Sequence, residues 1–128
     1  MMYAFVYSQS TGLFCLEDFD GNRAAIARGY SGFGSDQNDP DAEGKAGRGP
    51  IPRGIWKIGA PVHHIRFGPV SFPLQPVGHD AYHRSEFFIH GDNRRGDKSA
   101  STGCIVLDRP SRECIRALTS IRTLEVIL

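Results

Sequence analysis

The apolar segments of this 128-residue chain are short, and residues that favour turns separate them. Fifteen glycines and eight prolines punctuate the sequence, and no stretch reaches the roughly 18 consecutive apolar residues of a membrane-spanning helix. Short apolar runs bounded by glycine and proline are typical of β-strands. The pattern therefore predicts a mainly β fold of many short strands, with no insertion into a membrane.

Several runs have the length and residue types of strands. The first two flank the turn residues 9–12 and are expected to pair as a hairpin. The expected strands comprise residues 3–8, 13–16, 24–27, 55–58, 70–74, 87–89 and 123–128.

Two regions carry almost no regular pattern. Residues 29–49 contain six glycines and few apolar side chains beyond Tyr30 and Phe33, which predicts a long loop bordering a functional site. Residues 59–86 hold four prolines, so short strands such as 70–74 are the most that we expect there.

One helix is predicted near the C terminus. Asp108 can cap it, and Pro110 suits its first turn. Its apolar face is expected to include Ile115 together with the helically spaced Cys114, Leu118 and Ile121. We expect one domain, residues 1–128, built as a β-sandwich or partly open barrel of short strands with this C-terminal helix packed against it.

Charge and composition argue against several classes of protein. The net charge is +1, with 40% hydrophobic and 23% charged residues, so no basic field favours nucleic acid or a membrane surface. The N-terminal residues lack a basic leader and a cleavage site, so we expect synthesis in the cytoplasm without a Sec signal.

The cysteines and histidines do not form a recognisable metal or disulfide framework. Three cysteines leave at least one thiol free, and Cys15 and Cys114 are interpreted as structural. The spacing of the four histidines between residues 59 and 86 matches no metal signature, so we expect no metal or other cofactor. Those histidines, expected on surface loops, are His63, His64, His79 and His83.

His90 and Cys104 stand fourteen positions apart, each beside a run typical of a strand. Two adjacent strand ends would bring imidazole and thiol together, and a neighbouring imidazole converts a thiol into a nucleophile. The alternative is a small buried cysteine, the commonest state of a free thiol. Papain-like and NlpC/P60-like enzymes place cysteine first, which does not match this order. Caspases have the histidine first, but about 50 residues from the cysteine and with a different cysteine motif.

With these residues in view, the chain resembles the YkuD-type L,D-transpeptidase fold, whose signature places His-Gly or His-Ser before Ser-x-Gly-Cys. It is more closely similar to a family of bacterial type VI secretion effectors that act as L,D-transpeptidases or L,D-carboxypeptidases, formerly a domain of unknown function. The blocks that carry the resemblance are residues 7–12, 29–32, 49–54, 88–91 and 101–104, in that order. Thr102 departs from the wider pattern, in which many members carry a second histidine.

The resemblance implies a peptidoglycan stem tetrapeptide as substrate and Cys104 as the nucleophile on the carbonyl of its third residue. His90 would act as the acid and base, and the Gly91 carbonyl would orient its ring. The N–H groups of Gly103 and Cys104 would bind the oxyanion, with the Ser101 hydroxyl close by. Water as acceptor gives L,D-carboxypeptidase activity, a free D-amino acid gives exchange, and another stem gives a crosslink.

Other candidates for substrate contact are Thr102 in the nucleophile segment, Tyr30 in a Tyr-Ser-Gly segment and the basic Arg94 and Arg95. The arginines are otherwise interpreted as a solvated loop. The family resemblance also implies delivery by a type VI system to the periplasm of a target cell, and a cognate immunity protein. Two alternatives stay open: a catalytically silent peptidoglycan-binding module, and a cysteine amidase or peptidase of another specificity.

Overall fold

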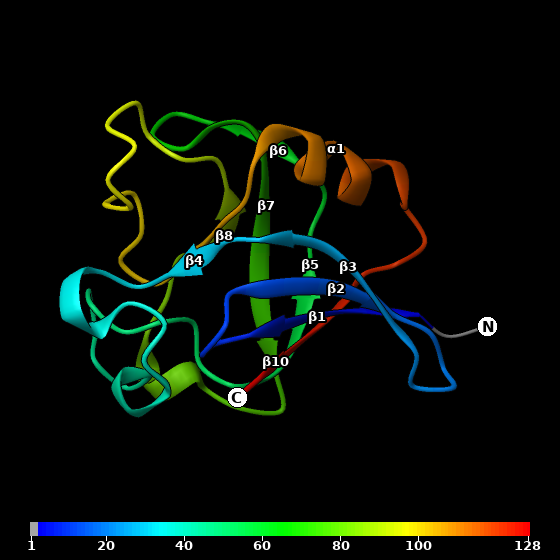
Figure 1. Cartoon of the computed structure of the whole chain (residues 1–128), viewed down its shortest axis with the longest axis horizontal. Helices are drawn as coiled ribbons and strands as arrows, with labels where there is room; N and C mark the ends of the chain where they lie inside the picture. Colours follow the sequence, from blue (N-terminus) through cyan, green and yellow to red (C-terminus); the bar gives the residue numbers. More distant parts are fainter. Residues whose placement is uncertain (1–2) are drawn as a thin grey trace.

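The structure is a computed structural model that describes residues 3–128, and strands dominate it (Figure 1). The single α-helix among these residues is α1 (Arg109–Ala117), and three 3-10 helices lie at Gly34–Asp36, Pro40–Ala42 and Ala81–His83. The strands are β1 (Ala4–Ser8), β2 (Leu13–Glu17), β3 (Arg23–Arg28), β4 (Tyr30–Ser31), β5 (Gly54–Ile58), β6 (Val62–His64), β7 (Gly68–Val77), β8 (Phe87–His90), β9 (Ile105–Val106) and β10 (Thr123–Ile127).

The strands form one mixed sheet in the order β3-β2-β1-β10-β5-β7-β8-β9-β4, with β6 paired to β7. The pairs β1–β10 and β8–β9 are parallel, and the others are antiparallel. The two outermost strands, β3 and β4, are separated in the chain by Gly29 alone. Since one residue spans only about 4 Å, the sheet must curl until its edges nearly meet. The sheet does not close. The structure is mainly β with one helix, which confirms the predicted architecture.

A continuous core fills the curled sheet. Trp56 is fully buried at its centre and packs edge to face against Phe87, with ring centroids 4.9 Å apart. Full burial of each large apolar side chain contributes on the order of 2 kcal/mol. The other large buried side chains include Phe5, Tyr7, Phe14, Ile51, Phe72, Ile89, Ile105 and Leu124. The strands that carry the functional residues are therefore fixed from inside.

The predicted N-terminal hairpin is confirmed as β1 and β2, which pair antiparallel. The predicted strands at 24–27, 55–58, 87–89 and 123–128 correspond to β3, β5, β8 and β10. The expected helix is confirmed as α1. Asp108 caps it as predicted, because its side chain accepts a hydrogen bond from Ser111 N, 2.9 Å away. No helix within residues 3–128 has the length and hydropathy to cross a membrane.

The expectation of only short strands between residues 59 and 86 was wrong, because β7 runs for ten residues through three prolines. Proline lacks an N–H and is tolerated where no ladder bond is needed. Pro76 lies beyond the pairing with β8, which ends at Leu74. Pro73 accepts a hydrogen bond from Gly59 N just past the end of β5. Both prolines thus lie where a neighbouring strand has ended.

The segment 29–49 is not a plain loop. It begins with β4, which pairs with β9, and contains two of the 3-10 helices. The second of these 3-10 helices has a side-chain cap, since Asp39 accepts a hydrogen bond from Asp41 N at its start. Figure 1 shows this segment beside β4, on the side of the sheet away from α1.

The predicted apolar face of the helix is confirmed for Ile115 and Ile121, which are buried, and was wrong for Cys114. Cys114 is exposed, whereas Ser111, Arg112 and Ile115 form the buried face. The helix packs on β7. The guanidinium of Arg112 donates to the carbonyl oxygens of Pro69 and Val70 in β7 and to that of Leu107, which precedes the helix. A buried arginine satisfied by three carbonyls therefore takes the place expected for the thiol.

Candidate active site

The parallel pairing of β8 with β9 places His90 and Cys104 on neighbouring segments. Ile89 is in register with Ile105, and Phe88 N donates a hydrogen bond to Cys104 Sγ over 3.3 Å. Because side chains two positions apart along a strand share a face, the imidazole lies on the same face of β8 as the Phe88 side chain. His90 and Cys104, 14 positions apart in sequence, thus lie on segments that are neighbours in space.

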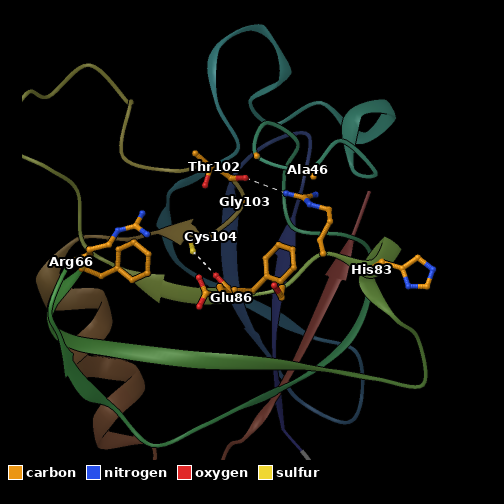
Figure 2. A pocket seen from close by; sticks show the side chains of 12 residues that line it. Ala46, Arg66, His83, Glu86, Thr102, Gly103 and Cys104 are labelled. Carbon is orange, nitrogen blue, oxygen red and sulfur yellow. Dashed lines mark hydrogen bonds between the residues drawn. The ribbon is translucent and has the colours of Figure 1, made fainter.

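The thiol opens into a cavity of about 330 Å³ that is lined by residues 46–47, 66–67, 83–87 and 102–104. Figure 2 shows Cys104 in the wall of this cavity, with Arg66 on one side and His83 on the other. The thiol also approaches Glu86 O at 3.5 Å. Burial raises the pKa of Cys104 to about 11, although the Phe88 N–H and the charges of Arg66 and Arg84 oppose that rise. The resting side chain is therefore a neutral thiol.

The imidazole of His90 is 2% exposed and is held on two sides. Its Nδ1 lies 2.7 Å from Gly91 O, a contact that requires the proton on Nδ1. Its ring stacks on Phe67 with centroids 4.1 Å apart and planes 2° apart. Burial lowers the pKa of His90, and the nearby positive charge of Arg112 adds to this effect. The ring is consequently neutral, with Nε2 left as the basic atom.

His90 Nε2 is buried and has no hydrogen-bond partner among residues 3–128, and the Cys104 thiol is directed to Phe88 and Glu86 instead. The segments that carry the two residues are neighbours, but the thiol and the imidazole are not hydrogen-bonded to each other. Leaving a buried nitrogen without a hydrogen bond costs about 1–3 kcal/mol of stability, so Nε2 of His90 would readily accept a hydrogen bond or a proton from a donor that reaches it.

The turn before Cys104 is held by two buried serines. Ser101 Oγ accepts hydrogen bonds from Gly32 N and Gly103 N and donates to Cys104 O. Ser31 Oγ donates to Gly103 O over 2.9 Å and accepts from Ile51 N. The Gly103 N–H expected to face an oxyanion is therefore engaged by Ser101, and the Cys104 N–H is the remaining backbone candidate.

Two glycines at the site lie against guanidinium groups. Gly103 has φ of 151°, and a Cβ there would lie 2.6 Å from Arg84 Nη2. A Cβ on Gly91 would lie 2.5 Å from Arg112 Nη2. Side chains at either position would displace a guanidinium that organises the site.

Arg84 ties the 43–50 segment to the nucleophile turn. Its Nη1 donates to the carbonyl oxygens of Glu43 and Pro50, and its Nη2 donates to those of Gly49 and Thr102. Thr102 is itself exposed and lines the cavity. Both Nη groups of Arg84 are thus engaged with main-chain carbonyls, and the side chain lines the cavity beside the thiol.

The other expected contact residues lie elsewhere. Tyr30 is buried, its hydroxyl donates to Asp92 Oδ1 over 2.6 Å, and it accepts from Ala100 N. It therefore fastens both ends of the 92–100 loop rather than lining the thiol's cavity. Arg94 and Arg95 are exposed in that loop and are absent from the lining of this cavity.

The remaining histidines and cysteines take varied places. His83 lines the thiol's cavity, His79 contacts Trp56, and His64 stacks on Phe67. Cys15 is half-buried in β2, and all three cysteines are free. No group of three or more His, Cys, Asp or Glu side chains within residues 3–128 is placed to hold a metal ion.

Sequence reasoning missed Phe67, Arg84 and Arg112, which contact or shape the site. Phe67 and Arg84 lie in the proline-rich segment that was expected to be irregular, and Arg112 lies on a helix whose buried face was misassigned. Each acts across more than 15 residues of sequence, so no local pattern signals it. The only signal of Phe67 in the sequence is that an aromatic residue follows the basic Arg66 in a turn.

The curled, open, mainly β sheet with one helix is an L,D-transpeptidase-like fold. Solved structures with this fold include Pgp2, the helical cell shape determining protein of Campylobacter jejuni (TM-score 0.65, 15% identity, 98% of this chain and 46% of that one). L,D-transpeptidase 1 of Mycobacterium tuberculosis gives a TM-score of 0.56 at 13% identity, with 99% and 62% covered. Bd1075 of Bdellovibrio bacteriovorus gives 0.62 at 14%, with 98% and 47% covered.

Residues 25–127 match the model of the Tlde1 domain, and the chain belongs to this family of type VI secretion effectors. The resemblance inferred from the sequence blocks is thereby confirmed. No curated protein matches the chain. The chain spans about half the length of Pgp2 and Bd1075.

Proposed function

We propose that this protein is an antibacterial enzyme that modifies peptidoglycan through an acyl-enzyme on Cys104. The substrate is a stem tetrapeptide, and the bond broken joins the carbonyl of the third residue to the terminal D-alanine. Membership of the Tlde1 family and a fold shared with an L,D-transpeptidase support a peptidoglycan substrate. The buried, unpartnered Nε2 of His90 beside the Cys104 segment is the observation that carries the proposal.

The first step is attack by sulfur on the scissile carbonyl carbon. Substrate entry turns the thiol away from Glu86 O, and its proton passes to His90 Nε2 as the carbon–sulfur bond forms. Both groups are neutral at rest, because burial raises the pKa of Cys104 and lowers that of His90. His90 therefore acts as a general base during attack, rather than as the cation of a preformed ion pair.

The tetrahedral intermediate then collapses. The carbon–nitrogen bond breaks, His90 returns its proton to the departing amine of D-alanine, and a thioester remains on Cys104. The Cys104 N–H is the proposed donor to the oxyanion, and the Gly103 N–H joins it only by leaving Ser101 Oγ. The thioester is resolved by water, giving L,D-carboxypeptidase activity, or by a D-amino acid, giving exchange.

Several further elements of the account are part of the same proposal. Residues 1–128 act as a single catalytic domain that needs no cofactor. Gly91 orients the ring of His90, and Ser101, Thr102 and Gly103 shape the nucleophile turn. Two arginines, Arg94 and Arg95, stay candidates for contact with the carboxylates of the stem peptide. Tyr30 stays a candidate through the 92–100 loop, which it fastens. Delivery by a type VI system, action in the target periplasm and neutralisation by an immunity protein belong to the same proposal, and membership of the family supports them.

Incubation with disaccharide tetrapeptide, followed by mass spectrometry, tests the proposal. We expect loss of D-alanine to give the tripeptide, and exchange when another D-amino acid is added. Cys104→Ala should abolish both products. A silent binding module would retain muropeptide binding without product, and an amidase or peptidase would cut a different bond. Either outcome contradicts the proposed reaction.

A further inference from the structure

We infer that Phe67 is a positioning residue for the reaction: it holds the plane of the His90 imidazole and shields it from water, so that Nε2 faces the thiol in one orientation. This inference rests on the proposed function, because it assigns a role toward the same histidine. Phe67 lies in the turn between β6 and β7, more than 20 residues before His90.

The contact between the two rings is close and parallel. The centroids are 4.1 Å apart and the planes differ by 2°, so the phenyl ring covers one face of the imidazole. The Gly91 carbonyl fixes His90 at Nδ1. One hydrogen bond leaves the ring free to tilt about it, and the stacked phenyl removes that freedom. The two contacts together determine the direction of Nε2.

Phe67 is itself held by neighbours. His64 stacks on its other side at 4.4 Å and 22°, and Phe88 packs at 5.4 Å. His64 Nδ1 also accepts hydrogen bonds from Arg66 N at 3.0 Å and from Phe67 N at 3.2 Å. The ring of His64 thus closes the turn that presents Phe67, and Phe67 is stacked with both His64 and His90.

Phe67 also lines two cavities. One is the cavity into which Cys104 opens, and the other, of about 220 Å³, is lined by His90 and Gly91 as well. Removal of the phenyl ring would uncover the face of the imidazole on which it stacks and admit water to that face. The charged and titratable groups that then act on His90 are Arg66 in the same turn, Arg112 on α1 and His64. Since burial is the largest cause of its lowered pKa, exposure should raise that pKa.

The experiment compares Phe67→Leu with the wild type, with Phe67→Tyr as the conservative variant that keeps a stacked ring. Ile65→Ala is the matched control, because Ile65 lies in the same turn and is 97% exposed. Two measurements are made on each protein: kcat and KM on tetrapeptide, and titration of the His90 ring by NMR. The titration is done with Cys104→Ala present in every protein, so that it does not depend on turnover.

We expect Phe67→Leu to lower kcat roughly 10- to 100-fold with little change in KM, as for a misplaced catalytic group. The His90 pKa should rise toward its ordinary value, while Phe67→Tyr and Ile65→Ala behave as the wild type. An unchanged titration, or a loss confined to KM, overturns the inference. If no protein shows turnover but Phe67→Leu still shifts the titration, the proposed function fails while the stack is supported. Circular dichroism checks that Phe67→Leu is folded.

Discussion

Glu43 joins the segment that borders the cavity to the rest of the fold, and its replacement gives a quantitative test of the structure. The side chain is buried and accepts hydrogen bonds from Arg53, Gln9 and Tyr82, with Arg53 Nη2 at 2.8 Å from Oε2. Its own carbonyl accepts from Arg84. Burial opposes ionisation of Glu43, but these hydrogen bonds, led by Arg53, outweigh it and lower its pKa from 4.5 to about 2.

The lowered pKa sets the size and the pH range of the effect. At about 1.36 kcal/mol per pKa unit, the difference between 4.5 and 2 corresponds to roughly 3 kcal/mol. The Arg53 side chain is 45% exposed, so solvent screens part of this, and we expect about 2 kcal/mol. Because the pKa is lower in the folded state, the stabilisation is present above pH 4.5 and is lost as the pH falls toward 2.

The perturbation is Glu43→Gln, and the assay is urea unfolding followed by circular dichroism at several pH values between 7 and 2. We expect the variant to lose about 2 kcal/mol at pH 7 and to show a flatter fall in stability with acid than the wild type. Glu113→Gln is the control, because the ion pairs of Glu113 lie on the exposed face of α1 and should matter little. Equal acid dependence in Glu43→Gln and the wild type would refute the reasoning.

Other consequences concern the site. His90→Gln should lower kcat/KM about 10²- to 10⁴-fold, measured by D-alanine release, and a variant of undiminished activity would remove the proposed base. In the wild type, the midpoint of the decline of kcat/KM toward acid should lie below pH 6.5, because burial lowers the pKa of His90 and keeps its ring neutral to lower pH; a midpoint above pH 6.5 would contradict this. Ser101→Ala should cost on the order of 2 kcal/mol in urea unfolding, since two buried N–H groups lose their acceptor, and an unchanged midpoint would count against the turn described. Arg84→Met should reduce activity, because the carbonyl groups that join the 43–50 segment to the nucleophile turn lose their donor; activity equal to that of the wild type would show that the turn keeps its structure without Arg84.

The sequence predicted the local elements well because hairpin strands and a capped helix are encoded by neighbouring residues. It also identified the blocks at 29–32 and 49–54, and the structure supplies their physical reason. Ser31 and Gly32 hold the turn before Cys104, and Ile51 N binds Ser31 Oγ. These blocks contact one another across 20 to 72 residues of sequence. The sequence therefore revealed that they belong together but not how they contact one another.

The misses share a cause, which is contact between distant segments. Prolines suggested an irregular 59–86 segment, yet β7 accommodates them because its neighbours end beside them. Helical spacing placed Cys114 inside, but the carbonyls of β7 favour burial of Arg112. Likewise, nothing local indicates that Phe67 lies over His90. Such contacts depend on how the sheet curls, which short-range patterns do not encode.

Intact-protein mass spectrometry after mixing with disaccharide tetrapeptide tests the central claim most directly. The account predicts a transient adduct equal to the substrate minus D-alanine, located on Cys104 by peptide mapping and absent in Cys104→Ala. The adduct should accumulate in the wild type and decay to the tripeptide. Release of D-alanine by Cys104→Ala, or an adduct on Cys15 or Cys114 alone, would contradict the assignment of Cys104 as the nucleophile.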